Sequence, residues 1–261
     1  MVNNLRGALG ALALLGWLVL CLPFVFLFWL TRLEPLRARM AQLFYKGGAF
    51  ICGLRVSVQG QVSPERPLML ISNHSSYLDV FIIGSLVPVS FTPKKEVRSW
   101  PVIGFLCVLG DCIFVERRPS EMQAAAAEMK KRLAKGKVLC LFPEGTTSDG
   151  YHVKPFKSGF LSLAEIYQMP VQPASIVYTH IGREPVTDAR REEIAWVGDA
   201  TFFGHFWHFL SLPAVRVEVV LHPARHIHEF ADRKALTQAC EQTITVGVQK
   251  LFAQISPTPP C

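Results

Sequence analysis

An uncharged stretch near the N-terminus is the feature that most constrains how this chain can fold. From Gly7 to Leu30 no residue carries a charge, and Leu, Ala, Val, Phe and Trp dominate. About 20 such residues in a helix span the roughly 30 Å hydrocarbon core of a bilayer. The stretch therefore predicts a membrane-anchoring helix, which Pro23 kinks without breaking. A cleaved signal peptide fits poorly, because its apolar region is normally shorter. A re-entrant pair of half-helices broken near Pro23 is the stronger alternative.

The charges that flank this stretch predict its orientation. One base, Arg6, precedes it, and four follow it closely: Arg32, Arg37, Arg39 and Lys46. The positive-inside rule then places the rest of the chain on the cytoplasmic face of the inner cell membrane. The segment Glu34–Phe50 is a second predicted helix, with one apolar face formed by Leu36, Met40, Leu43 and Phe44. It either lies in the membrane interface or packs on the domain as an ordinary amphipathic helix.

The overall charge narrows the choice of partners. The formal net charge is +7, and a basic surface attracts nucleic acid, anionic lipid or acidic substrates. No nucleic-acid-binding module is recognisable, and the apolar stretch favours a lipid surface. The bilayer is therefore an expected partner, and nucleic acid is not. The seven cysteines include no C-x-x-C pair and are typical of reduced thiols in a cytoplasmic domain.

Downstream of residue 53, short apolar runs bounded by turn residues alternate with helical patterns. The predicted strands are Leu54–Gln59, Leu68–Ser72, Ser90–Thr92, Asp111–Val115, Val138–Phe142, Val171–Tyr178 and Val215–Leu221. The predicted helices are Ser76–Ser85, Ser120–Lys135, Ser158–Gln168 and Phe230–Phe252. This alternation predicts an α/β layered domain with a largely parallel mixed sheet flanked by helices, preceded by the membrane-anchoring helix. We expect an anchor with its interfacial helix over residues 1–53, the layered domain over 54–255 and a loose tail over 256–261.

A histidine and an aspartate follow the predicted strand Leu68–Ser72. His74 and Asp79 belong to the run N-H-S-S-Y-L-D at residues 73–79. On a regular helix, residues five apart do not face each other, but they can meet if His74 lies on the turn before the helix. The carboxylate would then select one imidazole tautomer and leave the other nitrogen free to act as a base near pH 7. Taken alone, this spacing more often reflects a histidine that caps a helix start and an aspartate on a solvated turn.

Three further motifs follow in order. Residues 110–118 read G-D-C-I-F-V-E-R-R, in which a predicted strand ends in two arginines, whose guanidinium groups suit phosphate or carboxylate. Residues 142–146 read F-P-E-G-T and place an acidic group at the end of another strand. Residues 170–173 read P-V-Q-P and introduce a core strand. Taken alone, the first of these motifs also fits a pair of exposed arginines, the second a turn, and the third a proline with a structural role.

Together, the four blocks resemble the glycerolipid acyltransferase family, of which lysophosphatidic acid acyltransferases are the best-known members. The resemblance covers about Leu68 to Val177. It implies a membrane-bound enzyme of membrane lipid biosynthesis that transfers a fatty acyl chain from an acyl carrier protein or CoA thioester to the free hydroxyl of a lysolipid, without a metal or cofactor. It further implies that His74 is the general base and Asp79 its orienting partner. In the same way it assigns acceptor binding to Lys94, Arg117, Glu144, Gly145 and Thr146.

One position departs from the family pattern and bears on the acceptor. Lysophosphatidic acid enzymes usually carry Arg after F-P-E-G-T, whereas this chain has Thr147. A phosphomonoester would lose a charge-assisted contact typically worth about 1.5–3 kcal/mol. The run F-P-E-G-T-T-S-D-G, and more weakly W-V-G-D at residues 196–199, resembles the lyso-ornithine lipid branch of the family. That acceptor is therefore an alternative to 1-acylglycerol-3-phosphate.

Two other classes of function are compatible with parts of the sequence. Ser75 and Ser76 beside His74 could serve a lipid ester hydrolase, but no G-x-S-x-G motif is present. A non-catalytic membrane adaptor could retain the same fold. The intact His74, Asp79, Arg117 and Glu144 favour an enzyme over an adaptor.

Overall fold

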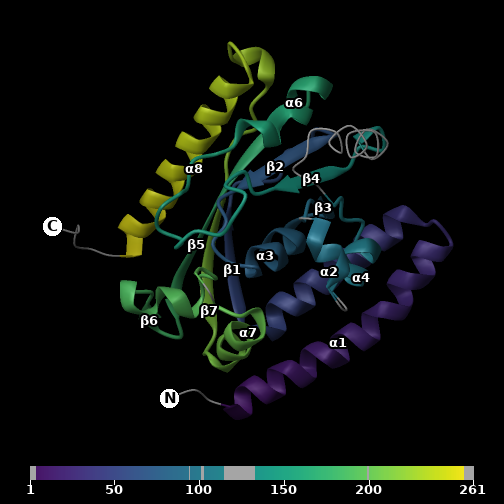
Figure 1. Cartoon of the computed structure of the whole chain (residues 1–261), viewed down its shortest axis with the longest axis vertical. Helices are drawn as coiled ribbons and strands as arrows, with labels where there is room; N and C mark the ends of the chain where they lie inside the picture. Colours follow the sequence, from purple (N-terminus) through teal and green to yellow (C-terminus); the bar gives the residue numbers. More distant parts are fainter. Residues whose placement is uncertain (1–3, 94, 101–102, 115–132, 199, 256–261) are drawn as a thin grey trace.

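A computed structural model describes residues 4–93, 95–100, 103–114, 133–198 and 200–255, and shows a seven-stranded sheet between two layers of helices (Figure 1). The strands are β1 (Leu54–Gln59), β2 (Leu68–Ser72), β3 (Val89–Phe91), β4 (Val138–Leu141), β5 (Val171–Ile181), β6 (Glu184–Pro185) and β7 (Val215–Leu221). Their order across the sheet is β1-β7-β5-β2-β4-β3, and β6 pairs with β5.

Strand direction makes the sheet mixed but mainly parallel. Strands β5, β2, β4 and β3 are parallel to one another, and β1 is parallel to β7. The pairing of β7 with β5 is antiparallel, as is that of β6 with β5. The predicted layered α/β fold with a largely parallel mixed sheet is therefore confirmed. Its central parallel strands place the ends of β2 and β4 at the same edge, where ligands of such sheets usually bind.

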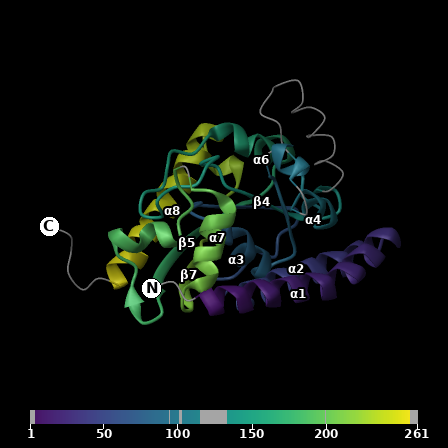
Figure 2. The same cartoon turned by 60° about the horizontal axis from the view of Figure 1, so that its bottom comes forward.

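Alternating side chains of the central strand fill two separate cores. On β2, Leu68 and Leu70 pack with α2 (Glu34–Ile51), α3 (Leu78–Leu86) and α7 (Phe202–Ser211). Met69 and Ile71 pack on the opposite face with α6 (Ser162–Tyr167) and α8 (Arg233–Ile255) (Figures 1 and 2). All four side chains are fully buried. Burial on both faces explains why β2 is a continuous apolar run rather than an alternating one.

The N-terminal stretch forms one long helix that folds back along the domain. Helix α1 (Asn4–Leu30) continues through Pro23, so the alternative of two half-helices broken there is wrong. After a turn at residues 31–33, α2 returns alongside α1, and the two form a hairpin along one side of the sheet domain (Figure 2). The indole of Trp17 donates to the Phe44 carbonyl at 3.1 Å. Gly47 permits this contact, since a Cβ there would lie 2.2 Å from the Trp17 ring.

Helix α1 keeps most of its apolar surface uncovered despite this packing. It is the one helix in the described part of the chain that is long and apolar enough to cross a membrane, with a mean hydropathy of 2.6. Its first half also contacts α7. Many of its large side chains stay exposed, among them Leu5, Leu12, Val19 and Leu30. This apolar surface would cost free energy in water and is suited to contact with lipid.

One predicted strand is wrong, and other predicted segments lie outside the described residues. Residues 111–114 form no strand. After α4 (Ile103–Leu109) the chain turns through Asp111 at φ +63°, and one ladder-like bond joins the Ile113 amide to the Phe91 carbonyl. Asp111 instead pairs with Arg37 at 2.9 Å. The tail and most of the helix predicted over Ser120–Lys135 lie outside the described residues. The remaining short helices are η1 (Lys95–Ser99), η2 (Ser158–Leu161), η3 (Asp188–Glu193) and η4 (Ile227–Glu229).

Candidate active site

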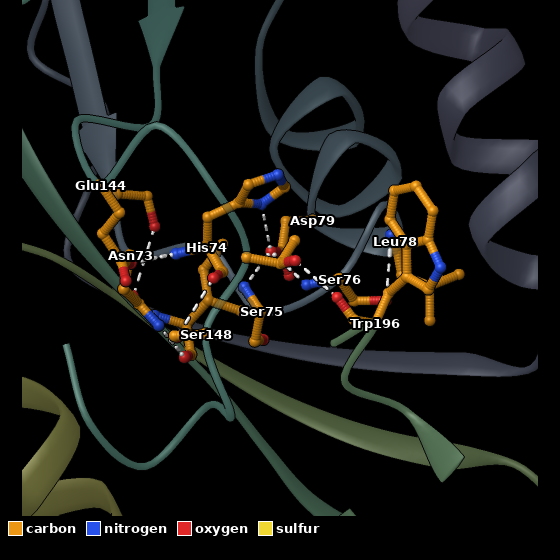
Figure 3. A network of polar contacts seen from close by, with 12 residues as sticks. Asn73, His74, Ser75, Ser76, Leu78, Asp79, Glu144, Ser148 and Trp196 are labelled. Carbon is orange, nitrogen blue, oxygen red and sulfur yellow. Dashed lines mark hydrogen bonds and ion pairs between the residues drawn. The ribbon is translucent and has the colours of Figure 1, made fainter. Parts of the chain in front are cut away.

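The predicted histidine and aspartate meet at the carboxyl end of β2. After Ser72 the chain leaves the sheet, and residues 73–77 form a non-helical turn before α3 begins at Leu78. His74 lies on this turn and Asp79 in the first turn of α3. Their side chains therefore face each other, with His74 Nδ1 2.8 Å from Asp79 Oδ2 (Figure 3).

The hydrogen bonds of Asp79 favour its ionised form. The side chain is fully buried, and Oδ2 also accepts the backbone amides of Ser75 at 2.9 Å and Ser76 at 3.0 Å. The hydroxyl of Tyr178 donates to Oδ1 at 2.6 Å. A carboxylate that accepts several donors is stabilised as an anion. Beside this anion, the proton of the neutral His74 ring lies on Nδ1, which leaves Nε2 as the basic nitrogen.

The loop that follows β4 holds the backbone of His74 on both sides. The buried Glu144 carboxylate accepts the His74 amide at 2.7 Å and the Lys154 amide at 2.9 Å. The Ser148 amide donates to the His74 carbonyl at 2.7 Å (Figure 3). Phe142, the first residue after β4, stacks on the imidazole with ring centroids 4.0 Å apart. These contacts fix the position of the imidazole, and the His74 side chain remains 19% exposed.

The predicted acceptor-binding residues divide into three groups. Glu144 lies directly against the His74 backbone, and burial raises the pKa of its carboxyl to about 7, although two backbone amides oppose the shift. Gly145 and Thr146 continue the same loop, and Thr146 is exposed. Lys94 and Arg117 lie outside the described residues.

The Gly145 amide closes the turn that carries Glu144. Gly145 adopts φ +71°, which an L side chain rarely tolerates, and its amide donates to the Phe142 carbonyl at 2.9 Å. A donor already used to close a turn is not available to a reacting oxygen. This amide therefore shapes the loop that holds the His74 backbone.

The serines beside His74 are not arranged as nucleophiles. Ser75 is buried, and its hydroxyl has no hydrogen-bond partner among the described residues. The Ser76 hydroxyl accepts the Leu78 amide at 3.4 Å. A serine nucleophile needs a base within hydrogen-bond reach. Neither hydroxyl has such a contact with His74, so the geometry does not favour the hydrolase alternative.

Thr147 serves the architecture of the loop. Its hydroxyl donates to the Trp196 carbonyl, and the Trp196 amide donates to the Ser75 carbonyl at 2.8 Å (Figure 3). The Lys154 ammonium donates to the Thr147 carbonyl at 2.7 Å. The residue that replaces the family's usual arginine thus joins the F-P-E-G-T loop to the segment containing Trp196 and to the turn carrying His74.

An aromatic wall stands beside the histidine turn. Tyr77 packs against Trp196, Phe202 and Phe206, with ring centroids between 5.0 and 5.8 Å apart. Its hydroxyl lies 2.8 Å from His205 Nδ1. On the same helix, α7, Phe209 is buried, whereas Phe203 is 81% exposed. The aromatic run at residues 202–209 therefore contributes both to the core and to an exposed edge.

Two contacts of the site were not anticipated from sequence. Asn73 opens the run at residues 73–79, but the sequence indicated no role for it. Its side chain donates to the Ile176 carbonyl at 2.9 Å and accepts the Ile176 amide at 2.8 Å. Tyr178, two residues farther along β5, reaches Asp79. No local signal marks Tyr178, because its partner lies 99 positions away in the sequence.

Comparisons with known proteins identify the family of this chain. Residues 54–177 match the Acyltransferase family model. A lyso-ornithine lipid O-acyltransferase of Brucella abortus is 32% identical over 95% of this chain and 96% of its own length. One from Rhizobium meliloti is 33% identical, over 100% and 94% respectively. The crystal structure of the 1-acyl-sn-glycerophosphate acyltransferase of Thermotoga maritima has the same fold, with a TM-score of 0.74 and 21% identity over 97% of this chain and 98% of that chain. On sequence and fold together, the chain belongs to the acyltransferase family and is an acyltransferase.

Proposed function

We propose that this enzyme transfers a fatty acyl group from an acyl carrier protein or CoA thioester to the free hydroxyl of a lysolipid, with His74 as the general base. The observation that carries the proposal is the 2.8 Å contact between His74 Nδ1 and the buried Asp79 carboxylate. It supports a neutral imidazole whose Nε2 accepts a proton. A base of this kind is what an alcohol needs to become a nucleophile near neutral pH.

The reaction then follows from the arrangement of the dyad. The lysolipid hydroxyl gives its proton to His74 Nε2 while its oxygen attacks the thioester carbonyl. The tetrahedral intermediate collapses by breaking the carbon–sulfur bond, and the leaving thiolate takes the proton back from the imidazolium. Asp79 stabilises the positive charge that His74 carries between these two transfers, as the carboxylate of a catalytic triad does.

The surrounding residues have supporting roles in this proposal. Glu144 holds the His74 backbone and forms one wall of the acceptor site, which Gly145 and Thr146 extend. Lys94 and Arg117 bind the charged head group of the acceptor. The two amides that Glu144 accepts support its role, since they tie the base to the loop that follows β4.

For the acceptor, we infer a lyso-ornithine lipid. Thr147 supplies no cation, and its hydroxyl is used by the Trp196 carbonyl, so the loop has no arginine for a phosphomonoester. The Brucella and Rhizobium relatives that align over nearly the whole chain carry the lyso-ornithine lipid name. The second candidate is 1-acylglycerol-3-phosphate, favoured by the fold shared with the Thermotoga enzyme.

The α1–α2 hairpin supports attachment to the cytoplasmic face of the inner membrane. We infer that residues 1–53 form the anchor with its interfacial helix, 54–255 the catalytic domain and 256–261 a short tail. Helix α1 packs along α2 and on α7, so a crossing by α1 would draw the charged residues of α2 into the hydrocarbon. Insertion into one leaflet avoids this cost. The insertion of α1 into one leaflet is tested by placing single cysteines along α1 and labelling them from outside in vesicles. An N-terminus on the periplasmic side would contradict this insertion.

The acceptor proposal is tested by competition. Purified protein in detergent receives one labelled acyl thioester together with lyso-ornithine lipid, lysophosphatidic acid and a zwitterionic lysophospholipid. We expect acylated ornithine lipid as the main product and no thioester consumption without acceptor. Phosphatidic acid as the main product would contradict the acceptor, and free fatty acid without acceptor would contradict transfer. His74→Ala should abolish transfer while leaving membrane binding intact.

A further inference from the structure

Tyr178 makes a contact with the catalytic dyad that lies away from the substrate side. It stands on β5, its side chain is buried, and its hydroxyl donates to Asp79 Oδ1 at 2.6 Å. The carboxylate it touches is fully buried. Burial raises the pKa of the Tyr178 phenol well above its ordinary value, so the hydroxyl keeps its proton and remains a donor.

The neighbouring strand fixes the position of this hydroxyl. Strand β5 pairs in parallel with β2, with Ser72 opposite Ala174. Directly after β2, the Asn73 side chain bonds both the amide and the carbonyl of Ile176. Side chains two residues apart on a strand share a face, so Tyr178 points to the same side as Ile176. The segment that presents His74 thus also sets the position of Tyr178.

The two oxygens of Asp79 have different partners. Oδ2 accepts three donors: His74 Nδ1 and the amides of Ser75 and Ser76. Among the described residues, the one hydrogen bond to Oδ1 comes from Tyr178. A buried carboxylate oxygen without a donor is costly. Without the phenol, the carboxylate could reduce that cost by rotating away from the imidazole.

The geometry points to Tyr178 as a positioning residue for the acyl transfer: its hydroxyl holds the Asp79 carboxylate turned so that Oδ2 faces His74. This inference rests on the proposed function, because it assumes that His74 is the base. Tyr178 acts through Asp79 and not on the substrate. Two other titratable groups, Glu144 and Cys140, interact electrostatically with Asp79, and neither donates a hydrogen bond to it in the described structure.

The test is Tyr178→Phe, which removes the hydroxyl and keeps the ring. We expect kcat to fall about 10-fold or more, as for a lost charge-assisted hydrogen bond, with KM for donor and acceptor unchanged. Tyr151→Phe is the matched control, since its hydroxyl donates to the Val186 carbonyl at 3.0 Å and not to the dyad. It should leave kcat and the KM values for donor and acceptor unchanged.

A double-mutant cycle separates positioning from mere packing. In an Asp79→Asn background no carboxylate remains to be stabilised, so adding Tyr178→Phe should change kcat less than twofold. An equal loss of kcat in both backgrounds, or a change in KM alone, would each overturn the inference. Thermal unfolding of each variant shows that the assayed protein is folded. His74→Ala in the same assay separates the two proposals: if it retains activity, the proposed function fails first.

Discussion

Replacing Asp79 with Asn removes the charge at the centre of the site while keeping the shape of the side chain. The amide oxygen can still accept Ser75 and Ser76, as Oδ2 does now. The amide nitrogen then faces Tyr178, whose hydroxyl can rotate to accept a hydrogen bond. The fold should therefore persist, because the substitution creates no cavity and removes a buried charge. What is lost is the electrostatic support for a protonated His74.

The size of this loss follows from the geometry of the pair. His74 Nδ1 and Asp79 Oδ2 are 2.8 Å apart. Two charges centred about 4 Å apart interact by about 4 kcal/mol at an effective dielectric constant of 20. This stabilisation is absent when the imidazole is neutral and present once it has taken the proton from the acceptor. A barrier raised by about 4 kcal/mol lowers kcat about 10³-fold.

The assay is steady-state acyl transfer in detergent with saturating donor and acceptor. Asp79→Asn should lower kcat by about three orders of magnitude and leave KM nearly unchanged, because the carboxylate is fully buried behind the imidazole. Asp188→Asn is the control, since its side chain is 89% exposed and pairs with Arg191. If Asp79→Asn keeps kcat within tenfold of the parent while the thermal unfolding of the two proteins agrees, the dyad mechanism is refuted.

Three further predictions concern stability. Because burial raises the Glu144 pKa from 4.5 to about 7, the folded state holds its proton more tightly than the unfolded state. The unfolding free energy should then fall by about 3 kcal/mol between pH 4.5 and 7. In denaturant titrations, Glu144→Gln should flatten this dependence on pH, and an unchanged dependence would contradict the raised Glu144 pKa. Gly47→Leu should force the Trp17 ring away from α2, lower the unfolding free energy by about 1–3 kcal/mol and weaken binding to vesicles. Normal vesicle binding would show that the packing of α1 on α2 is not required for membrane attachment. Asn73→Ala should cost about 2–4 kcal/mol by leaving the Ile176 amide and carbonyl unsatisfied, and a loss below 1 kcal/mol would contradict that accounting.

Local patterns in the sequence predicted most of the architecture. The apolar run at residues 68–72 is β2, and the alternation of strands and helices correctly indicated a layered, mainly parallel sheet. The H-x4-D spacing also located the dyad, because a strand followed by a short turn restricts where His74 can point. These features depend on neighbours within about ten residues.

Other features required partners that are distant in the sequence. The residues at 111–114 have the composition of a buried strand, yet a left-handed turn at Asp111 and its pairing with Arg37 keep them out of the sheet. The course of α1 was likewise open, because hydropathy specifies that the helix is apolar but not what it lies against. Its packing on α2 and α7 resolved that question.

By itself, the sequence determined the fold class, because short-range hydropathy and turn chemistry encode it. Through the resemblance of four short motifs to a known family, it also indicated the reaction family and the positions of the proposed base and its carboxylate partner. Only the tertiary structure decided how the base is held. Glu144 and Tyr178 reach the His74 turn from β4 and β5, which lie beside β2 in the sheet although they are remote along the chain. Strand order and register bring such groups within hydrogen-bonding distance, and both are set by the packing of the whole domain rather than by any one segment.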